Sequence, residues 1–345
     1  MKLDVNSLLS SKDNFKKYSN VKSILIKGNY SRLNPEFSIV IPTYKRVSNL
    51  FETLESAINQ DYKGYYDIIV CDNNPERNDE TEKYISAIKD NRIIYYKNAG
   101  NIGMTGNWNR CIELCDGKYL VMVHDDDILY PFYLSRCKKI LSRFPYIDAI
   151  YPLKDKWFQY KDEKRPKPCK KLKAKLFKLQ VIDYILGNID PPTGILINKD
   201  KVFYSGGFPI EAFPSADYYF NVKIVQQLNV YRLIYPMSIY RWNVNESFKV
   251  ETIQKFREFD KPLLSWICKQ TKMPHIINNI LNSYYDVQNK RNIVKLCLSD
   301  VYKVDFAHYT FPPNYFYEYI YKKTLLGLSF YIKVKHYFNE KLIRF

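Results

Sequence analysis

Short apolar runs alternate with amphipathic stretches between residues 37 and 127, and this alternation restricts the fold more than any other feature of the chain. The apolar runs have the length of strands buried on both faces and lie at residues 38–41, 68–71, 93–96 and 119–123. The stretches between them repeat apolar residues at helical spacing, at residues 48–58, 81–89 and 107–115. Strand and helix in alternation predict a mostly parallel sheet with helices on its faces.

Polar residues stand directly after each of the four predicted strands. The clusters are Thr43 and Tyr44, then Asp72, Asn73 and Asn74, then Asn98, Gly100 and Asn101, and finally Asp125, Asp126 and Asp127. The carboxyl ends of parallel strands share one edge of the sheet, and ligands bind in the crevice there. We therefore expect these clusters to form a single site.

The charge and length of the chain restrict its class but do not identify its ligand. The 345 residues suffice for one large or two modest domains, and 53 Lys and Arg against 36 Asp and Glu give a net charge of +17. A hydrophobic content of 46% excludes a disordered polycation. A positive surface attracts phosphate in nucleotides, nucleic acids or lipid headgroups without choosing among them.

The location of the protein is expected from what the sequence lacks. No apolar run approaches the roughly 18 residues of a membrane span, and the N-terminus has no apolar signal core. The 7 cysteines show no paired C-x-x-C spacing, which is typical of reduced thiols. We expect a cytoplasmic protein.

Three parts are predicted along the chain: an N-terminal extension (1–36), a sheet-containing domain (37–250) and a helical C-terminal region (251–345). In the second part we expect strands at 195–198, 231–234 and 239–242 and a helix at 215–227. Residues 154–178 carry eleven basic and three acidic residues. A solvated loop or helix face is favoured over a dedicated anion-binding lip for this segment.

Three consecutive aspartates follow the fourth predicted strand. The mutual repulsion of Asp125, Asp126 and Asp127 is costly unless a cation or strong donors offset it. All-oxygen ligands suit Mg²⁺ or Mn²⁺, which keep open positions for substrate phosphates. An N-terminal cap on the following segment explains the same residues equally well.

Other candidates also carry two interpretations each. Asp72 either accepts hydrogen bonds from a nucleobase or ribose or stabilises a turn. Residues 98–107 can bring backbone close to a phosphate, although they lack the dinucleotide and P-loop spacings. Asp217 is either a general base or a helix cap, and Arg241 either clamps a diphosphate or lies on the surface.

Seven segments in order resemble the family 2 glycosyltransferases. They are Ser38–Arg46, Gln60, Ile68–Asn73, Asn101–Asn109, Gly117–Pro131, Gly206–Phe208 and Ala216–Tyr218. The resemblance covers roughly residues 37–245. It implies an α/β fold of the GT-A (Rossmann-like) type, with a mostly parallel central sheet flanked by helices and a C-terminal helical extension.

The resemblance also implies a donor and the residues that bind it. The donor would be a nucleoside diphosphate sugar, most often UDP-hexose or UDP-N-acetylhexosamine, held by residues 37–127. The nucleotide-binding residues would be Pro42, Thr43, Tyr44, Arg46, Asp72, Asn101, Asn107, Asp125 and Arg241. Asp126 and Asp125 would coordinate Mn²⁺ or Mg²⁺, and strand alternation leaves Asp127 open as a further ligand.

Residues 128–250 would form the acceptor half. The acceptor-side residues would be Pro192, Thr193, Gly194, Gly207 and Ala216. Asp217 occupies the position of the family's catalytic base, so it would take the proton from an acceptor hydroxyl in a single displacement that inverts the anomeric carbon. The expected role is bacterial polysaccharide assembly.

Two departures from the family pattern keep other functions open. The family usually has Glu where Ala216 stands, and many relatives have His shortly after the position of Arg241. A catalytically impaired relative that binds a nucleotide sugar or a partner is therefore the main alternative. A sugar nucleotidyltransferase would need a glycine-rich loop that residues 41–44 lack, and a nucleic-acid-binding protein would place its phosphates beside the aspartates. We expect no nucleic acid partner.

The end of the chain forms an amphipathic pattern. The apolar face comprises Phe330, Val334, Tyr337, Phe338 and Phe345, and the opposite face Lys333, Glu340 and Arg344. Such a helix either rests on an anionic membrane or docks on its own domain. Membrane contact would place the protein at the inner face of the plasma membrane, near a lipid-linked acceptor.

Overall fold

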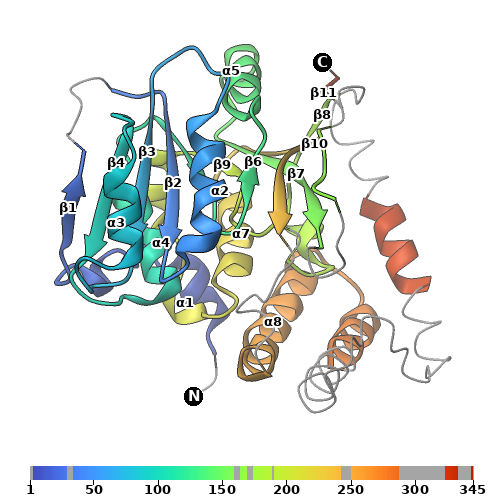
Figure 1. The fold of residues 1–345 in the computed structure, drawn as a ribbon. Helices are drawn as coiled ribbons and strands as arrows, with labels where there is room; N and C mark the ends of the chain where they lie inside the picture. The colour runs from blue at the N-terminus through green and yellow to red at the C-terminus, as the bar shows by residue number, and fades with distance from the viewer. Residues whose placement is uncertain are drawn as a thin grey trace.

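The computed structural model describes residues 3–28, 34–158, 164–168, 174–188, 190–241, 250–286, 323–332 and 343–344. In these residues one large sheet lies between layers of helices (Figure 1). The described strands run in the order β1-β4-β3-β2-β5-β9-β7-β10-β8-β11, with β6 paired to β10. The predicted α/β architecture is confirmed.

The four predicted strands form the parallel half of this sheet. They are β2 (Phe37–Thr43), β3 (Tyr66–Asp72), β4 (Ile93–Asn98) and β5 (Tyr119–Met122), in the spatial order β4-β3-β2-β5. Every residue in them is buried. This burial on both faces explains why the strands read as continuous apolar runs and not as an alternating pattern.

Helices cover the two faces of the sheet and form two cores. On one face, α2 (Val47–Ile58), α3 (Glu80–Ala87) and α5 (Tyr133–Arg143) pack on side chains such as Ile39 and Ile41. On the other face, α4 (Gly103–Leu114), α6 (Lys199–Ser205) and α7 (Ala216–Gln227) pack on side chains such as Val40. Successive residues of β2 thus alternate between the two cores.

The second half of the sheet is mixed. β9 (Ile195–Asn198) runs antiparallel to β5 and to β7 (Ala149–Trp157), whereas β10 (Val230–Arg241) is parallel to β7. The two strands predicted at 231–234 and 239–242 are one strand, β10, whose register shifts on both sides of Pro236. A proline has no N–H to donate to the ladder, which explains the interruption.

The basic segment at 154–178 has strands at its ends, not a helix. Residues 154–157 belong to β7, and β8 (Lys175–Lys178) pairs antiparallel with β10. Residues 164–168 have no regular structure, and the remainder of the segment at 159–163 and 169–173 lies outside the described residues. β6 (Ile128–Leu129) also pairs with β10 and closes the loop that follows β5.

Residues 3–28 of the predicted extension are part of the folded body. β1 (Ser23–Lys27) extends the sheet antiparallel to β4, and α1 (Val5–Ser10) buries Val5, Leu8 and Leu9 in the core. The chain then passes close to α7, where Lys223 Nζ donates to the carbonyl of Ser11 at 2.6 Å. Short apolar segments separated by polar residues gave too weak a periodicity to predict this packing.

The C-terminal region is helical where the structure describes it, with one exception. α8 (Val250–Gln270) and helical residues 275–286 and 323–332 are followed by β11 (Ile343–Arg344), which pairs with β8. Phe330 of the predicted apolar face is exposed, and the other residues of that face lie outside the described residues. No helix among the described residues combines the length and the hydropathy that a membrane crossing requires.

Candidate active site

The polar clusters that follow β2 and β5 meet at the carboxyl edge of the sheet, as predicted. Thr43, the last residue of β2, donates its hydroxyl hydrogen bond to Asp125 Oδ2 at 2.8 Å. Arg46 Nη1 lies 3.1 Å from Asp126 Oδ2 and 3.7 Å from Asp125 Oδ1. Residues 82 positions apart in sequence thus share hydrogen bonds at one edge.

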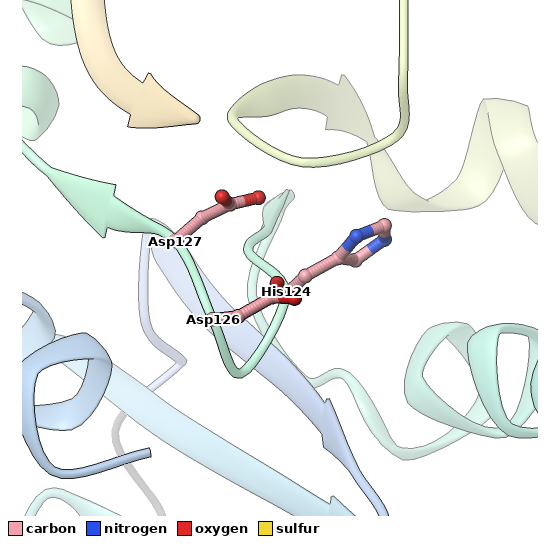
Figure 2. A group of neighbouring side chains, drawn as sticks. All are labelled: His124, Asp126 and Asp127. Carbon is pink, nitrogen blue, oxygen red and sulfur yellow. The ribbon is translucent and has the colours of Figure 1, made fainter. Parts of the chain in front are cut away.

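His124, Asp126 and Asp127 form a group that can hold a metal ion. One ligand atom from each side chain lies within 4.8 Å of the others, and all three side chains leave the loop after β5 (Figure 2). Among the described residues, His124 Nε2 and Asp127 Oδ2 are buried without a hydrogen-bond partner. Unfilled buried acceptors on an imidazole and a carboxylate fit a divalent cation such as Mn²⁺ or Mg²⁺.

The ionisation of this group is shaped by burial. Burial, and next the charge of Asp126, raise the pKa of Asp127 well above its ordinary value. Burial lowers the pKa of His124 to about 4, so the ring is neutral and its nitrogen is available as a ligand. His124 also stacks on Trp108, with ring centroids 5.3 Å apart. A nearby cation would offset the cost of the buried carboxylates.

Asp125 is hydrogen-bonded to the end of β2 and is not part of this group. Besides the hydrogen bond from Thr43, its surroundings include Arg46, and burial followed by the charge of Asp126 raises its pKa to about 7. Of the predicted metal ligands, Asp126 and Asp127 therefore lie in the group and Asp125 lies on the side of Thr43. His124 was not predicted as a ligand. It lies two residues before Asp126, and in an extended segment residues two apart point to the same side, so the sequence did indicate it.

Arg241 holds the aspartate loop against α2. Its backbone N–H donates to Asp127 Oδ1 at 2.8 Å, Nη1 donates to Glu52 Oε2 at 2.6 Å, and Nη2 donates to the carbonyl of Asn49 at 3.1 Å. Its Nε donates to the carbonyl of Asp126, and the side chain is only 4% exposed. These bonds already occupy the guanidinium, so the structure gives Arg241 a role in holding the loop. Its predicted contact with a diphosphate stays a prediction.

Asp72 is fully buried and bonded on both oxygens. Its Oδ1 accepts from the N–H of Asn74 at 2.9 Å, and Oδ2 accepts from Tyr95 Oη at 2.8 Å and Lys97 Nζ at 3.0 Å. The hydrogen bond from Asn74 stabilises a turn, which is the second of the two roles that the sequence predicted for Asp72. Contact with a nucleobase stays a prediction and would have to use the remaining lone pairs.

The other predicted nucleotide-binding residues differ in accessibility. Tyr44 is 44% exposed at the rim, whereas Pro42 is buried inside β2. Asn101 Oδ1 accepts from Gly103 N at 2.8 Å at the start of α4. Asn107 is buried and donates to the carbonyl of Cys71 at 2.9 Å, so the structure gives it a role in joining α4 to β3.

Two of the predicted acceptor-side residues border the metal group. Thr193 Oγ1 accepts from the N–H of His124 at 3.1 Å, and the N–H of Gly194 donates to the carbonyl of Met122 at 2.6 Å. Pro192 is buried directly before them. The loop before β9 thus lies against the loop that carries the aspartates.

Gly207 and Ala216 are explained by packing. Gly207 has φ +66°, and a Cβ there would lie 2.5 Å from Asn109 Oδ1, which accepts from the N–H of Phe208 at 2.8 Å. Ala216 is fully buried at the start of α7. Acceptor contacts of these two residues stay predictions.

Asp217 stands in the first turn of α7 and is half-buried. Its Oδ1 accepts from the N–H of Tyr218 at 2.8 Å, and Oδ2 accepts from Asn188 Nδ2 at 2.7 Å. Burial, and next the charge of Asp260 on α8, raise the pKa of Asp217 to about 7. A carboxyl with this pKa can accept a proton near neutral pH. Asn188 and Asp260 carry no sequence signal, because only the tertiary fold brings them to Asp217.

The comparisons with known proteins agree with the fold and with the resemblance. Residues 38–202 match the family model described as glycosyl transferase family 2. An uncharacterized glycosyltransferase of Methanocaldococcus jannaschii is 33% identical over 132 residues, which cover 37% of this chain and 43% of the relative. The Escherichia coli "UDP-Glc:alpha-D-GlcNAc-diphosphoundecaprenol beta-1,3-glucosyltransferase WfaP" is 37% identical over 90 residues, covering 26% of this chain and 35% of the relative.

A solved structure extends the comparison to most of the chain. S. aureus TarS 1–349 in complex with UDP-GlcNAc superposes with a TM-score of 0.53 at 15% identity, covering 80% of this chain and 76% of that chain. This likeness confirms the GT-A fold. The stretches matched by the two curated relatives span less than half the length of each relative.

Proposed function

Because this chain carries a family 2 glycosyltransferase domain at residues 38–202, we propose that it transfers a sugar from a nucleoside diphosphate sugar to a hydroxyl of a glycan or lipid-linked acceptor. The proposal rests on the side chains that meet at the carboxyl edge of the sheet. There a His/Asp/Asp group has unfilled buried ligand atoms, and α7 supplies a separate carboxyl, Asp217, with a pKa of about 7.

The names of relatives support the chemical classes of donor and acceptor. WfaP is named for UDP-Glc and for an acceptor sugar on diphosphoundecaprenol. A Campylobacter jejuni relative, 33% identical over 104 residues that cover 29% of this chain and 33% of the relative, is also named as a glucosyltransferase acting on an undecaprenol-linked glycan. We therefore propose a UDP-linked donor and a lipid-linked acceptor in bacterial polysaccharide assembly.

The donor would be held between the ends of β2 and β5. Thr43, Tyr44, Arg46 and Asp125 would border the nucleotide, and His124, Asp126 and Asp127 would hold Mn²⁺ or Mg²⁺. When bound, the cation would supply positive charge that stabilises the departing diphosphate. Arg241 acts indirectly in this proposal, because it fixes the backbone of the aspartate loop through Asp126 and Asp127.

Asp217 would act as the general base. Asn188 holds Oδ2 of its carboxylate at 2.7 Å, and Tyr218 holds Oδ1 at 2.8 Å, so its orientation is fixed before the acceptor binds. The acceptor hydroxyl gives its proton to Asp217 as its oxygen attacks the anomeric carbon, and the bond to the diphosphate breaks. One displacement of this kind inverts the configuration.

A donor screen tests the proposal. We expect the melting temperature of the protein in Mn²⁺ to rise with one class of nucleotide sugar from a panel linked to UDP, GDP and dTDP, because a ligand that binds only the folded state stabilises it. The donor that binds should then be hydrolysed slowly without acceptor. Binding without any turnover would favour the catalytically impaired relative, and no binding of any member would refute the donor assignment.

The pH dependence of transfer is a further prediction. A base with a pKa of about 7 must lose its proton to act, so we expect activity to rise with pH through about 7. The variant Asp260→Asn removes a neighbouring negative charge and should move this midpoint to lower pH, while burial, the larger cause, remains. The pH profile of kcat/KM checks both statements. An unchanged midpoint in Asp260→Asn would contradict the coupling.

We also propose peripheral contact with an anionic membrane through the C-terminal helices. Ile276, Leu326 and Phe330 are 66%, 65% and 68% exposed. Close to them is an open cavity of about 460 Å³, whose lining includes Met273, Ile277, Leu328 and Tyr331 together with Lys272. Exposed apolar side chains beside lysines are typical of a surface that binds anionic lipid.

Flotation with vesicles tests this contact. The double variant Leu326→Asp/Phe330→Asp should bind vesicles of anionic phospholipid about tenfold less than the wild type, because it removes two exposed apolar groups and adds repulsive charge. Tyr204→Asp is the matched control, since Tyr204 is 77% exposed on α6. Wild-type protein that stays with the unbound fraction would refute the membrane contact.

A further inference from the structure

Lys154 of β7 is a half-buried lysine without a bonded partner. Among the residues that the structure describes, its ammonium forms no hydrogen bond and no ion pair. Burial lowers the pKa of Lys154, while the charges of Asp190 and Asp127 act to raise it. A half-buried lysine without a protein partner is free to pair with an anionic ligand, and such pairing offsets the cost of its partial desolvation.

The position of Lys154 is fixed by the loop before β9 and by β10. A Cβ added to Gly194 would lie 3.7 Å from Lys154 Cε, and Thr193 next to it accepts the hydrogen bond of His124. Lys154 is in register with Ser238 of β10, whose hydroxyl is buried without a partner among the described residues, like His124 Nε2 and Asp127 Oδ2. Unsatisfied polar atoms thus gather beside the metal group.

The same lysine lies between the metal group and the surroundings of Asp217. Its charge lowers the pKa of His124 on one side, and Asp190 acts on it from the other. Asn221 Nδ2 donates both to the carbonyl of Asp190 at 2.7 Å and to Asn188 Oδ1 at 3.0 Å, and Asn188 holds Asp217. The phosphate that carries the sugar belongs between these two groups, because the bond to be broken joins that phosphate to the carbon attacked.

Four other cations near this edge are already paired. Arg241 is bonded to Glu52 and to the backbone, Arg232 is paired with Asp190, and Lys97 is paired with Asp72 and Asp79. Arg46 is paired with Asp125 and Asp126. Unlike these four described cations, Lys154 can bind an anion without giving up a protein partner.

We propose that Lys154 binds the sugar-bearing phosphate of the nucleoside diphosphate donor. This inference rests on the proposed function and deepens it. The ammonium would supply a charge-assisted hydrogen bond to that phosphate, which strengthens as negative charge grows on the departing diphosphate.

Calorimetry with diphosphates of different kinds tests the proposal. The titrants are Mn²⁺ with inorganic pyrophosphate, UDP, GDP or dTDP, added to the wild type, Lys154→Met, Lys154→Arg and the control Lys139→Met, which removes an exposed lysine of α5. Lys154→Met should weaken pyrophosphate and the preferred nucleoside diphosphate about ten- to a hundredfold, as expected for a hydrogen bond to a charged group. Lys154→Arg should recover part of this loss, and Lys139→Met should change nothing.

The outcomes separate this inference from the proposed function. If the wild type binds a nucleoside diphosphate and Lys154→Met binds it equally well with an unchanged melting temperature, the role of Lys154 is refuted and the donor site stands. If the wild type binds pyrophosphate alone and loses it in Lys154→Met, the phosphate role stands and the nucleotide assignment fails. If the wild type binds neither, both are refuted.

Discussion

Asp217→Asn is expected to lower the rate of sugar transfer by about two to four orders of magnitude, the usual contribution of a general base. The amide keeps the size of the carboxylate and can still accept from Tyr218 N, so the fold should persist. It cannot take a proton at neutral pH. The measurement is kcat with saturating donor and acceptor, together with the dissociation constant of the donor, which should change less than about twofold because the loss falls on the chemical step.

The control for this prediction is a carboxylate elsewhere on the surface. Asp200→Asn makes the same chemical change on a side chain that is 77% exposed in the first turn of α6, and it should leave transfer unchanged. If Asp217→Asn transferred sugar as fast as Asp200→Asn, Asp217 would not be the base. A second carboxyl would then have to be sought, and Asp260, whose pKa burial raises to about 6, would be the first to test.

Asp127→Asn is expected to weaken Mn²⁺ binding by about a hundredfold and to reduce transfer accordingly. Loss of a group that merely orients a metal ligand costs about ten- to a hundredfold in affinity, and loss of a ligand charge should cost at least the upper value. The amide oxygen can still accept the hydrogen bond that Arg241 N donates to Oδ1 at 2.8 Å. Calorimetry with Mn²⁺ alone measures the effect.

A stability measurement separates a metal ligand from a structural carboxylate. Without metal, Asp127 is fully buried and burial raises its pKa, so its charged form destabilises the folded state at neutral pH. Asp127→Asn should therefore keep or raise the melting temperature in EDTA. A clear fall in EDTA, with Mn²⁺ affinity unchanged, would assign Asp127 to the architecture of the loop and not to a metal site.

The parallel half of the fold was predictable because its signals are local. Each strand from β2 to β5 is a short apolar run, and each is followed by polar residues at the sheet edge. The mixed half was predictable only in part. The strand at 195–198 and the two ends of β10 were expected, whereas β7, which carries lysines and a proline, was not, and Pro236 in the middle of β10 made one strand look like two. The packing of α1 under α7 and the return of β11 to β8 depend on contacts between the ends of the chain and its centre, which no local pattern reveals.

The positions of several candidate site residues were predictable, whereas their roles stay predictions. Thr43, Asp126 and Asp217 stand at the sheet edge or in the first helical turn where the sequence placed them. Asp72, Asn107 and Arg241 are engaged with the protein itself, because a side chain near a ligand site also has to hold the backbone there. Asn188 and Asp260 come to Asp217 from a loop and a helix whose sequences give no sign of it. Lys154 lies in the basic segment for which an anion-binding lip was the less favoured interpretation.

The net charge of +17 is not spread evenly along the chain. The edge that would bind the donor is acidic around Asp125, Asp126 and Asp127, and its arginines are paired with carboxylates. A phosphate backbone without a cation would be repelled there, which argues against nucleic acid as the ligand of this edge. Much of the excess lies elsewhere, including residues 156–178 of the basic segment and Lys272 beside the C-terminal cavity.

The central claim is that this acidic edge binds a nucleoside diphosphate through a divalent cation. Calorimetric titration of the wild type with UDP, GDP and dTDP, once in Mn²⁺ and once in EDTA, tests it most directly. We predict that one of the three binds in Mn²⁺ and that its affinity falls at least about a hundredfold in EDTA, because the carboxylates then repel the diphosphate. Equal binding in EDTA, or no binding of any of the three in Mn²⁺, would contradict the claim.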